Sequence, residues 1–121
     1  AAAAAVASAP ALSDTVAGEA GQRWGGRPRV LLLGRPAAVG ADGAMTLLGT
    51  IAGLGAAFLV PVAGFFPARA VLVLGATGFA CNLLDSVAGA TLQRRLGPRG
   101  NDWTNLLATL AGALGGALTA A

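Results

Sequence analysis

The sequence contains no lysine, no histidine and no tyrosine, and it has a single cysteine. Without lysine it cannot build the lysine-bearing phosphate loop of P-loop nucleotide-binding proteins, and without histidine it has no imidazole general base. Soft metal ions would lack their nitrogen and sulfur ligands. Cys81 alone cannot form a disulfide within the chain. Oxygen atoms and arginine therefore remain as the groups available for chemistry.

Charge is also scarce. Charged residues make up 11% of the 121 residues, whereas soluble domains average about 25%. Hydrophobic residues make up 55%, and the mean hydropathy is +0.71. This balance favours an integral membrane protein. The net charge of +3 comes from eight arginines against five acids, and the short loops that hold those arginines suggest phosphate groups as partners and no nucleic acid.

Apolar segments of about the 20 residues that span a bilayer alternate with polar loops. A secretory signal is the alternative reading of the first segment, but no basic region precedes it. Small residues recur three or four apart, as at Gly49 and Gly53, and this spacing is typical of closely packed membrane helices. We therefore predict an all-α polytopic membrane helix bundle. We take 1–121 as a single transmembrane domain, part of a longer family domain, with about four helices at residues 1–21, 45–65, 69–93 and 102–120.

The loops can be assigned to sides by counting arginines. Segments 22–44 and 94–100 should share a side, because two predicted helices separate them. Together they hold seven of the eight arginines, and Arg69 lies in the opposite turn. By the positive-inside rule we predict that both segments are cytoplasmic. Within the first of them, the run at 30–34 is consistent with either a short strand or an interfacial loop.

Asp85 lies near the middle of the apolar segment 82–93. Helical spacing places it on one stripe with Asn82, Ser86, Gly89 and Gln93. An ionised carboxylate at that depth in hydrocarbon costs about 2.5–3.5 kcal/mol, so it requires a partner. One interpretation is a hydrogen bond that packs helices together. We favour the other, a polar cavity for a ligand, because further polar or small residues share its face.

All five acids lie in or near the predicted cytoplasmic part of the chain. Carboxylates beside arginines, with no histidine or cysteine set, suit a hard cation such as Mg²⁺ held together with phosphate oxygens. Simpler readings remain for single residues: Asp102 as a helix N-cap, Glu19 as a solvated helix end, and Asp42 as a turn residue. We predict Asp85 and Asp14 as catalytic residues, and the predicted Mg²⁺ ligands are Asp14, Glu19, Asp85 and Asp102.

Four segments in order resemble a known family, the domain-of-unknown-function 92 integral membrane proteins. They are SDTVAGEAG (13–21), GADGAMTLLGT (40–50), GFACNLLDSVAGATLQ (78–93) and NDWTN (101–105). The family contains the animal transmembrane protein 19 and the plant phytyl-phosphate kinase of the tocopherol pathway. The resemblance spans nearly the whole chain and matches the carboxy-terminal portion of the family.

The resemblance implies a CTP-dependent kinase that transfers a phosphoryl group to an isoprenoid monophosphate, with Mg²⁺, at the cytoplasmic membrane face. The implied partners are membrane lipid, the prenyl phosphate and CTP, with a homo-oligomer as a further expectation. The arginines have an alternative role, which is to set orientation in the membrane. The expected nucleotide- and phosphate-binding residues are Arg94, Arg95, Arg35, Gly40, Gly43, Asn101 and Asn105. The expected substrate-binding residues are Ser86, Gly89, Gln93 and Thr15.

A second function of a different class is compatible with the same residues. A non-enzymatic membrane transporter or helix-packing module would also place acids in a polar site near the bilayer midplane. In that protein Asp85 and Asp14 would bind an ion or a transported substrate.

Overall fold

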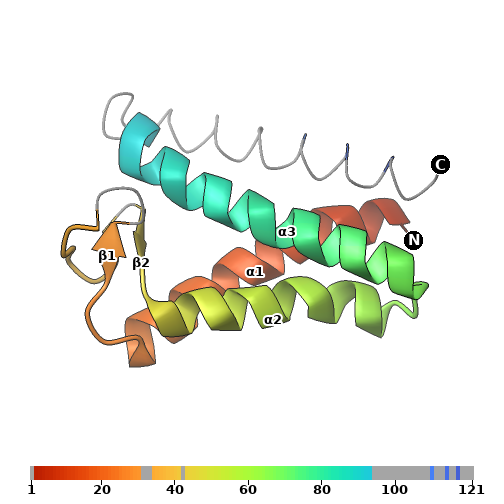
Figure 1. Ribbon diagram of the computed structural model, residues 1–121, viewed down its shortest axis with the longest axis horizontal. Helices are drawn as coiled ribbons and strands as arrows, with labels where there is room; N and C mark the ends of the chain where they lie inside the picture. The colour runs from red at the N-terminus through yellow and green to blue at the C-terminus, as the bar shows by residue number, and fades with distance from the viewer. Residues whose placement is uncertain are drawn as a thin grey trace.

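The computed structural model describes residues 2–30, 34–41 and 43–93 and the single positions 110, 114 and 117. Three helices run along one another in this part of the chain (Figure 1). Two short strands lie at one end of the bundle, and a π-helical turn, η1, follows the third helix. The elements in order are α1 (Ala2–Trp24), β1 (Arg29–Val30), β2 (Ala44–Met45), α2 (Leu47–Ala63), α3 (Ala68–Ala88) and η1 (Gly89–Gln93).

Small residues bring α1 and α2 into close contact. A Cβ atom added at Gly49 would lie 2.6 Å from the backbone oxygen of Ala17 and 3.1 Å from the Cα of Gly21. One turn further along α2, a Cβ at Gly53 would lie 2.8 Å from the Cβ of Ala17. These distances leave no room for a side chain, so the close packing expected at Gly49 and Gly53 is confirmed.

The start of α2 is fixed by Thr46. Its backbone is extended, with φ −115° and ψ 154°, and its side chain accepts a hydrogen bond from the Gly49 N–H at 3.0 Å. Such a cap satisfies one of the four N–H groups that a helix leaves unpaired at its beginning. Thr46 is also the contact point for α1, because a Cβ at Gly21 would lie 2.9 Å from the Thr46 Oγ1.

The segment between α1 and α2 is folded back on itself by β1 and β2. The two strands pair antiparallel, with Arg29 opposite Met45 and Val30 opposite Ala44. The fold is therefore mostly helical and includes a small two-stranded sheet that the all-α prediction did not contain. Of the run at 30–34, Val30 belongs to β1, and residues 31–33 lie outside the described residues.

The segment between α1 and α2 contacts the carboxyl end of α3 through Gly43. Gly43 has φ +71°, a left-handed conformation that glycine adopts readily. A side chain there would collide with the Ser86 backbone oxygen and with Ala90. The segment 22–44 and the carboxyl end of α3 thus lie at the same end of the bundle, while Arg69 begins α3 at the opposite end (Figure 1).

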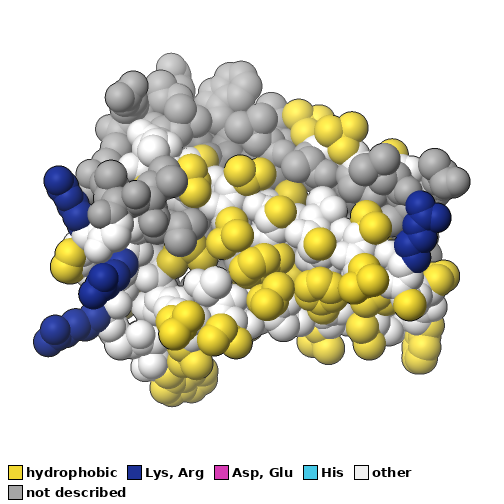
Figure 2. All heavy atoms as spheres, viewed as in Figure 1, with side chains coloured by type: hydrophobic (Ala, Val, Ile, Leu, Met, Phe, Trp, Pro, Cys, Tyr) yellow, Lys and Arg dark blue, Asp and Glu magenta, His cyan; other side chains and the backbone are white. Residues whose placement is uncertain are grey.

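Large apolar side chains cover the outside of the bundle. Figure 2 shows them along the middle of the molecule, with the basic side chains of this face at its two ends. Apolar surface of this extent on a monomer marks a lipid- or protein-facing region. On the three described helices, the exposed large hydrophobic residues include Trp24, Leu47, Leu48, Ile51, Leu54, Leu59, Val62, Leu72 and Leu84.

Among the described residues, one helix is both long and apolar enough to cross a membrane, Ala68–Thr91. Only 28% of it is buried inside the fold, unlike the core helix of a soluble protein. The helix Leu47–Ala63 is apolar but shorter. Four membrane spans are therefore not established by the structure. The fourth predicted span falls largely outside the described residues, where only Leu110, Leu114 and Ala117 are seen, each helical and exposed.

Candidate functional site

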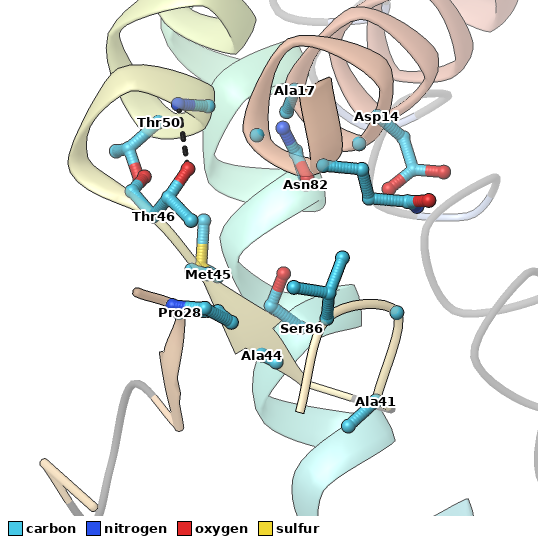
Figure 3. Close-up of a pocket in the computed structure, with 16 residues that line it drawn as sticks. Asp14, Ala17, Pro28, Ala41, Ala44, Met45, Thr46, Thr50, Asn82 and Ser86 are labelled. Atoms are coloured by element: carbon cyan, nitrogen blue, oxygen red, sulfur yellow. Dashed lines mark hydrogen bonds between the residues drawn. The ribbon is translucent and has the colours of Figure 1, made fainter. Parts of the chain in front are cut away.

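An open cavity of about 140 Å³ lies where the three helices meet the segment between α1 and α2 (Figure 3). Most of its wall comes from α1 and from described residues between positions 28 and 46. The rest comes from Gly49 and Thr50 near the start of α2, and from Asn82 and Ser86 toward the carboxyl end of α3. Glycine and alanine make up much of the lining, which leaves the space open. The polar side chains that line it are Asp14, Gln22, Thr46, Thr50, Asn82 and Ser86.

A buried chain of hydrogen bonds joins the three helices beside this cavity. The Ser13 hydroxyl of α1 donates to the Gly53 backbone oxygen of α2 at 2.9 Å. The Asn82 side-chain amide of α3 donates to the Ser13 Oγ at 2.8 Å. Ser13 and Asn82 are 0% and 2% exposed. We call Ser13, Gly53 and Asn82 the three-helix node. It fixes how α3 sits against the α1–α2 pair.

The hydroxyl groups of Thr46 and Thr50, at the start of α2, already form hydrogen bonds with the backbone of this helix. Thr46 Oγ1 accepts from the Gly49 N–H, and the Thr50 hydroxyl donates its proton to the Thr46 backbone oxygen at 2.9 Å. The Thr50 oxygen can therefore still accept a hydrogen bond or bind a cation. The beginning of α2 also carries the positive end of the helix dipole, which favours an anion nearby.

Among the acids that the structure describes, Asp14 lies in the cavity wall and Asp85 lies close to Asp14. The charge of Asp14 lies near enough to that of Asp85 for the two to repel each other. Asp85 does not line the cavity. Its Oδ1 atom is buried and has no hydrogen-bond partner within the described part of the chain. A buried acceptor without a partner requires an explanation, and binding of a cation would provide one.

Of the remaining predicted metal ligands, the structure describes Glu19, and it does not line the cavity with Asp14. Glu19 is exposed and forms an ion pair with Arg23 of its own helix, with 3.2 Å between Oε2 and the Arg23 nitrogen. Asp102 lies outside the described residues. Within the described ranges, no three acids, histidines or cysteines are grouped as a metal site. Of the four predicted ligands, Asp14 and Asp85 are the two described acids that lie close to each other.

The predicted substrate and phosphate residues are dispersed. Ser86 and Gly40 line the cavity. Gly89 is buried where η1 begins, and a π-helical turn of this kind is frequent at functional sites. Gly43 packs against Ala90 and does not line the cavity.

Two further predicted residues, Thr15 and Arg35, do not line the cavity. The exposed Thr15 hydroxyl donates to the Ala11 backbone oxygen of its own helix at 2.9 Å, and Arg35 is exposed in the loop after β1. Other predicted positions lie outside what the structure describes: Arg94, Arg95, Asn101, Asn105 and the side chain of Gln93.

Sequence reasoning missed part of the cavity wall. Thr46, Thr50 and Gln22 were not predicted as site residues. Asn82 was placed on the Asp85 stripe without a role of its own. A signal for Thr46 was present, since a hydroxyl residue directly before an apolar run is a common helix start. Nothing in the sequence pairs Ser13 with Asn82, which are 69 positions apart.

Apolar helices with an uncovered hydrophobic exterior and a polar cavity at their arginine-rich end define a helical integral membrane protein. The family model of the integral membrane protein DUF92 matches residues 1–113, and the chain belongs to this family. The resemblance seen in the sequence motifs is thereby confirmed, and so is a location in the membrane.

Two curated relatives are membrane proteins described as uncharacterized. One, from Methanocaldococcus jannaschii, is 38% identical over 113 residues, which cover 91% of this chain and 47% of the relative. The other, from Synechocystis, is 31% identical over 106 residues, which cover 84% of this chain and 41% of the relative. The chain thus spans less than half the length of each. No solved structure matches the chain.

Proposed function

We propose that this chain supplies the phosphate-handling part of a CTP-dependent prenyl-phosphate kinase. The terminal phosphoryl group of CTP would pass to an oxygen of an isoprenoid monophosphate. The P–O bond to CDP breaks, a new P–O bond forms, and the products are CDP and the prenyl diphosphate. The observation that carries the proposal is the cavity itself, in which an acid, an amide and hydroxyls open at the arginine-rich end of an apolar bundle.

The size of the cavity suits a phosphoryl group. Small-molecule sites usually measure about 300–1,000 Å³, and this cavity is about 140 Å³. The nucleotide base would therefore lie beyond it. The prenyl tail would lie along the exposed leucines and valines of the helices, where lipid also lies.

The residues in and beside the cavity suit two different reactants, phosphate oxygens and Mg²⁺. The start of α2, which carries the positive end of the helix dipole, favours phosphate oxygens. Asp14 and Asp85 suit Mg²⁺, which prefers oxygen ligands, and the buried unpaired Oδ1 of Asp85 is an observation that fits a cation. When bound, Mg²⁺ neutralises phosphate charge. The acceptor phosphate is already anionic, so the absence of histidine is no obstacle.

A turnover assay on the complete protein tests this proposal. Purified protein would be incubated with Mg²⁺, each of CTP, ATP, GTP and UTP, and phytyl, geranylgeranyl or farnesyl monophosphate. We expect a prenyl diphosphate, detected by mass spectrometry, with CTP as the preferred donor. No diphosphate from any pair, in protein shown to be folded and inserted, would contradict the proposal.

The transporter alternative also has an observation in its favour. Asp85 lies in the helix that is long and apolar enough to span a membrane, and a carboxylate there is typical of ion pathways. Flux measurements in sealed vesicles would test it. Ion-coupled uptake without kinase turnover would favour the transporter.

A further inference from the structure

The three-helix node determines which atom of Asn82 faces the cavity. Asn82 is almost fully buried, yet it lines the cavity. Its side chain ends in one hydrogen-bond acceptor, Oδ1, and one donor group, Nδ2. Which of the two faces the cavity decides whether this wall attracts an anion or a cation.

The orientation follows from the single proton of Ser13. A serine hydroxyl has one proton to donate, and Ser13 donates it to the Gly53 backbone oxygen. The side of the Ser13 oxygen that faces Asn82 can then only accept. The group opposite it must be the Asn82 Nδ2, as observed at 2.8 Å. The Asn82 Oδ1 is consequently turned away from Ser13.

This orientation adds an acceptor to a cavity wall that already carries others. Asp14 contributes a carboxylate, and Thr50 contributes an oxygen whose proton is committed to the Thr46 backbone. Among the described residues, the one hydrogen bond of the Asn82 side chain is the one to Ser13, so Oδ1 keeps its lone pairs. Figure 3 shows Asn82 on the same side of α3 as Ser86, facing this space.

We propose that the Asn82 Oδ1 is a ligand for a hard divalent cation in this cavity, together with the Asp14 carboxylate, and that Ser13 positions it. Amide and carboxylate oxygens are the ligands that such cations take, whereas a bare phosphate would be repelled by them. The inference rests on the proposed function for the identity of the cation as Mg²⁺. It adds Asn82 and Ser13, which neither the motifs nor the acid pattern assigned.

Binding of Mn²⁺ alone to the full chain in detergent tests the proposal without nucleotide. The electron paramagnetic resonance signal of free Mn²⁺ falls as the ion binds. We expect Asn82→Ala to weaken binding about tenfold or more, and Ser13→Ala to weaken it about tenfold, which is typical of a residue that orients a metal ligand.

Thr91→Ala is the matched control. Like Ser13, Thr91 donates its hydroxyl to a backbone oxygen, that of Val87 at 2.9 Å, but it is exposed and outside the cavity. We expect its Mn²⁺ affinity to be unchanged. Should Asn82→Ala fail to fold, Ser13→Ala decides the matter.

Two results would overturn the inference. One is the absence of Mn²⁺ binding by the unmodified chain. The other is binding by the folded Ser13 and Asn82 variants that equals that of Thr91→Ala. The kinase proposal fails separately: Mn²⁺ binding that depends on Asn82, without turnover of any prenyl phosphate, supports this cation site and removes the kinase.

Discussion

Among single residues, Asp85 has the least satisfied environment in the described chain. It lies in an apolar helix, near the charge of Asp14, and one of its oxygens is buried without a hydrogen-bond partner there. Two nearby carboxylates destabilise each other unless a proton or a cation lies between them. This arrangement supports the proposed cation-binding role of Asp85 over a purely structural one.

The substitution Asp85→Asn separates these roles. It keeps the shape and hydrogen-bonding capacity of the side chain and removes the charge. If Asp85 holds the cation, we expect thermal stability in detergent to be unchanged or higher, because a costly charge in an apolar helix is gone. Turnover should fall about a hundredfold or more, since preorganised charge is usually a large part of catalysis. Near-full turnover by the complete protein would show that Asp85 only packs helices.

For the helices as elements, close approach depends on glycine at particular positions. Gly53 and Gly55 both lie in α2, two residues apart, and they face opposite environments. A Cβ at Gly53 would lie 2.8 Å from the Ala17 Cβ and 2.9 Å from the Asn82 Nδ2. A Cβ at Gly55 would meet no atom within 4 Å.

Because of this contrast, replacing glycine with alanine should change the stability of the bundle differently at the two positions. Gly53→Ala should destabilise the bundle by about 1–3 kcal/mol, as overpacking usually does. Gly55→Ala should be neutral or stabilise it by up to about 1 kcal/mol, because alanine is the better helix former. Thermal unfolding of both variants in the same detergent measures the difference. Equal stabilities would mean that α1, α2 and α3 are less closely packed than described.

The connection between α1 and α2 depends on Gly43 in a different way. Gly34 and Gly43 both have positive φ, +59° and +71°. Only Gly43 is also in contact with α3, where a side chain would meet the Ser86 oxygen and Ala90. Gly34 has open space around it.

We therefore expect Gly34→Ala to cost about 1–2 kcal/mol of backbone strain alone. Gly43→Ala should carry the same strain and in addition push the segment 34–45 away from α3. Limited proteolysis of this segment and thermal unfolding would compare the two variants. A Gly43→Ala protein that is cut no faster than Gly34→Ala would contradict the described contact with α3.

For the whole molecule, the distribution of charge predicts an orientation in the membrane. Four arginines, Arg23, Arg27, Arg29 and Arg35, lie at the end that carries the cavity, and Arg69 lies at the other. The positive-inside rule places the cavity on the cytoplasmic side. A nucleotide would be available there, so the orientation also bears on the proposed function.

Cysteine labelling in intact cells tests this orientation. In a Cys81→Ala background, single cysteines would replace Ala38 and Ala68, which are both exposed and lie at opposite ends. We expect an impermeant maleimide to label position 68 from outside, and position 38 only after the membrane is opened. The reverse pattern would invert the orientation, and labelling of both positions from outside would mean that α2 does not cross the membrane.

The sequence alone determined the class of protein and the approximate positions of the three helices that the structure describes. Hydropathy and capping are local properties, so the apolar runs located α2 and α3, and the motifs around Asp14 and Asp85 identified the family. The sequence also predicted one polar site between α1 and α3, because both helices carry an acid where an apolar residue would otherwise be expected. Glu19 was grouped with Asp14, although five residues at about 100° each turn the two to different faces of α1.

Only the tertiary structure decided how these faces meet. Ser13 and Asn82 are unremarkable in their own segments, and their roles arise because Gly53 lets three helices approach at one level. The hydrogen bond to the Gly53 oxygen then fixes the Ser13 proton, and through it the orientation of the Asn82 amide. No local pattern encodes such a chain of contacts, since each donor finds its acceptor only when distant segments are packed together.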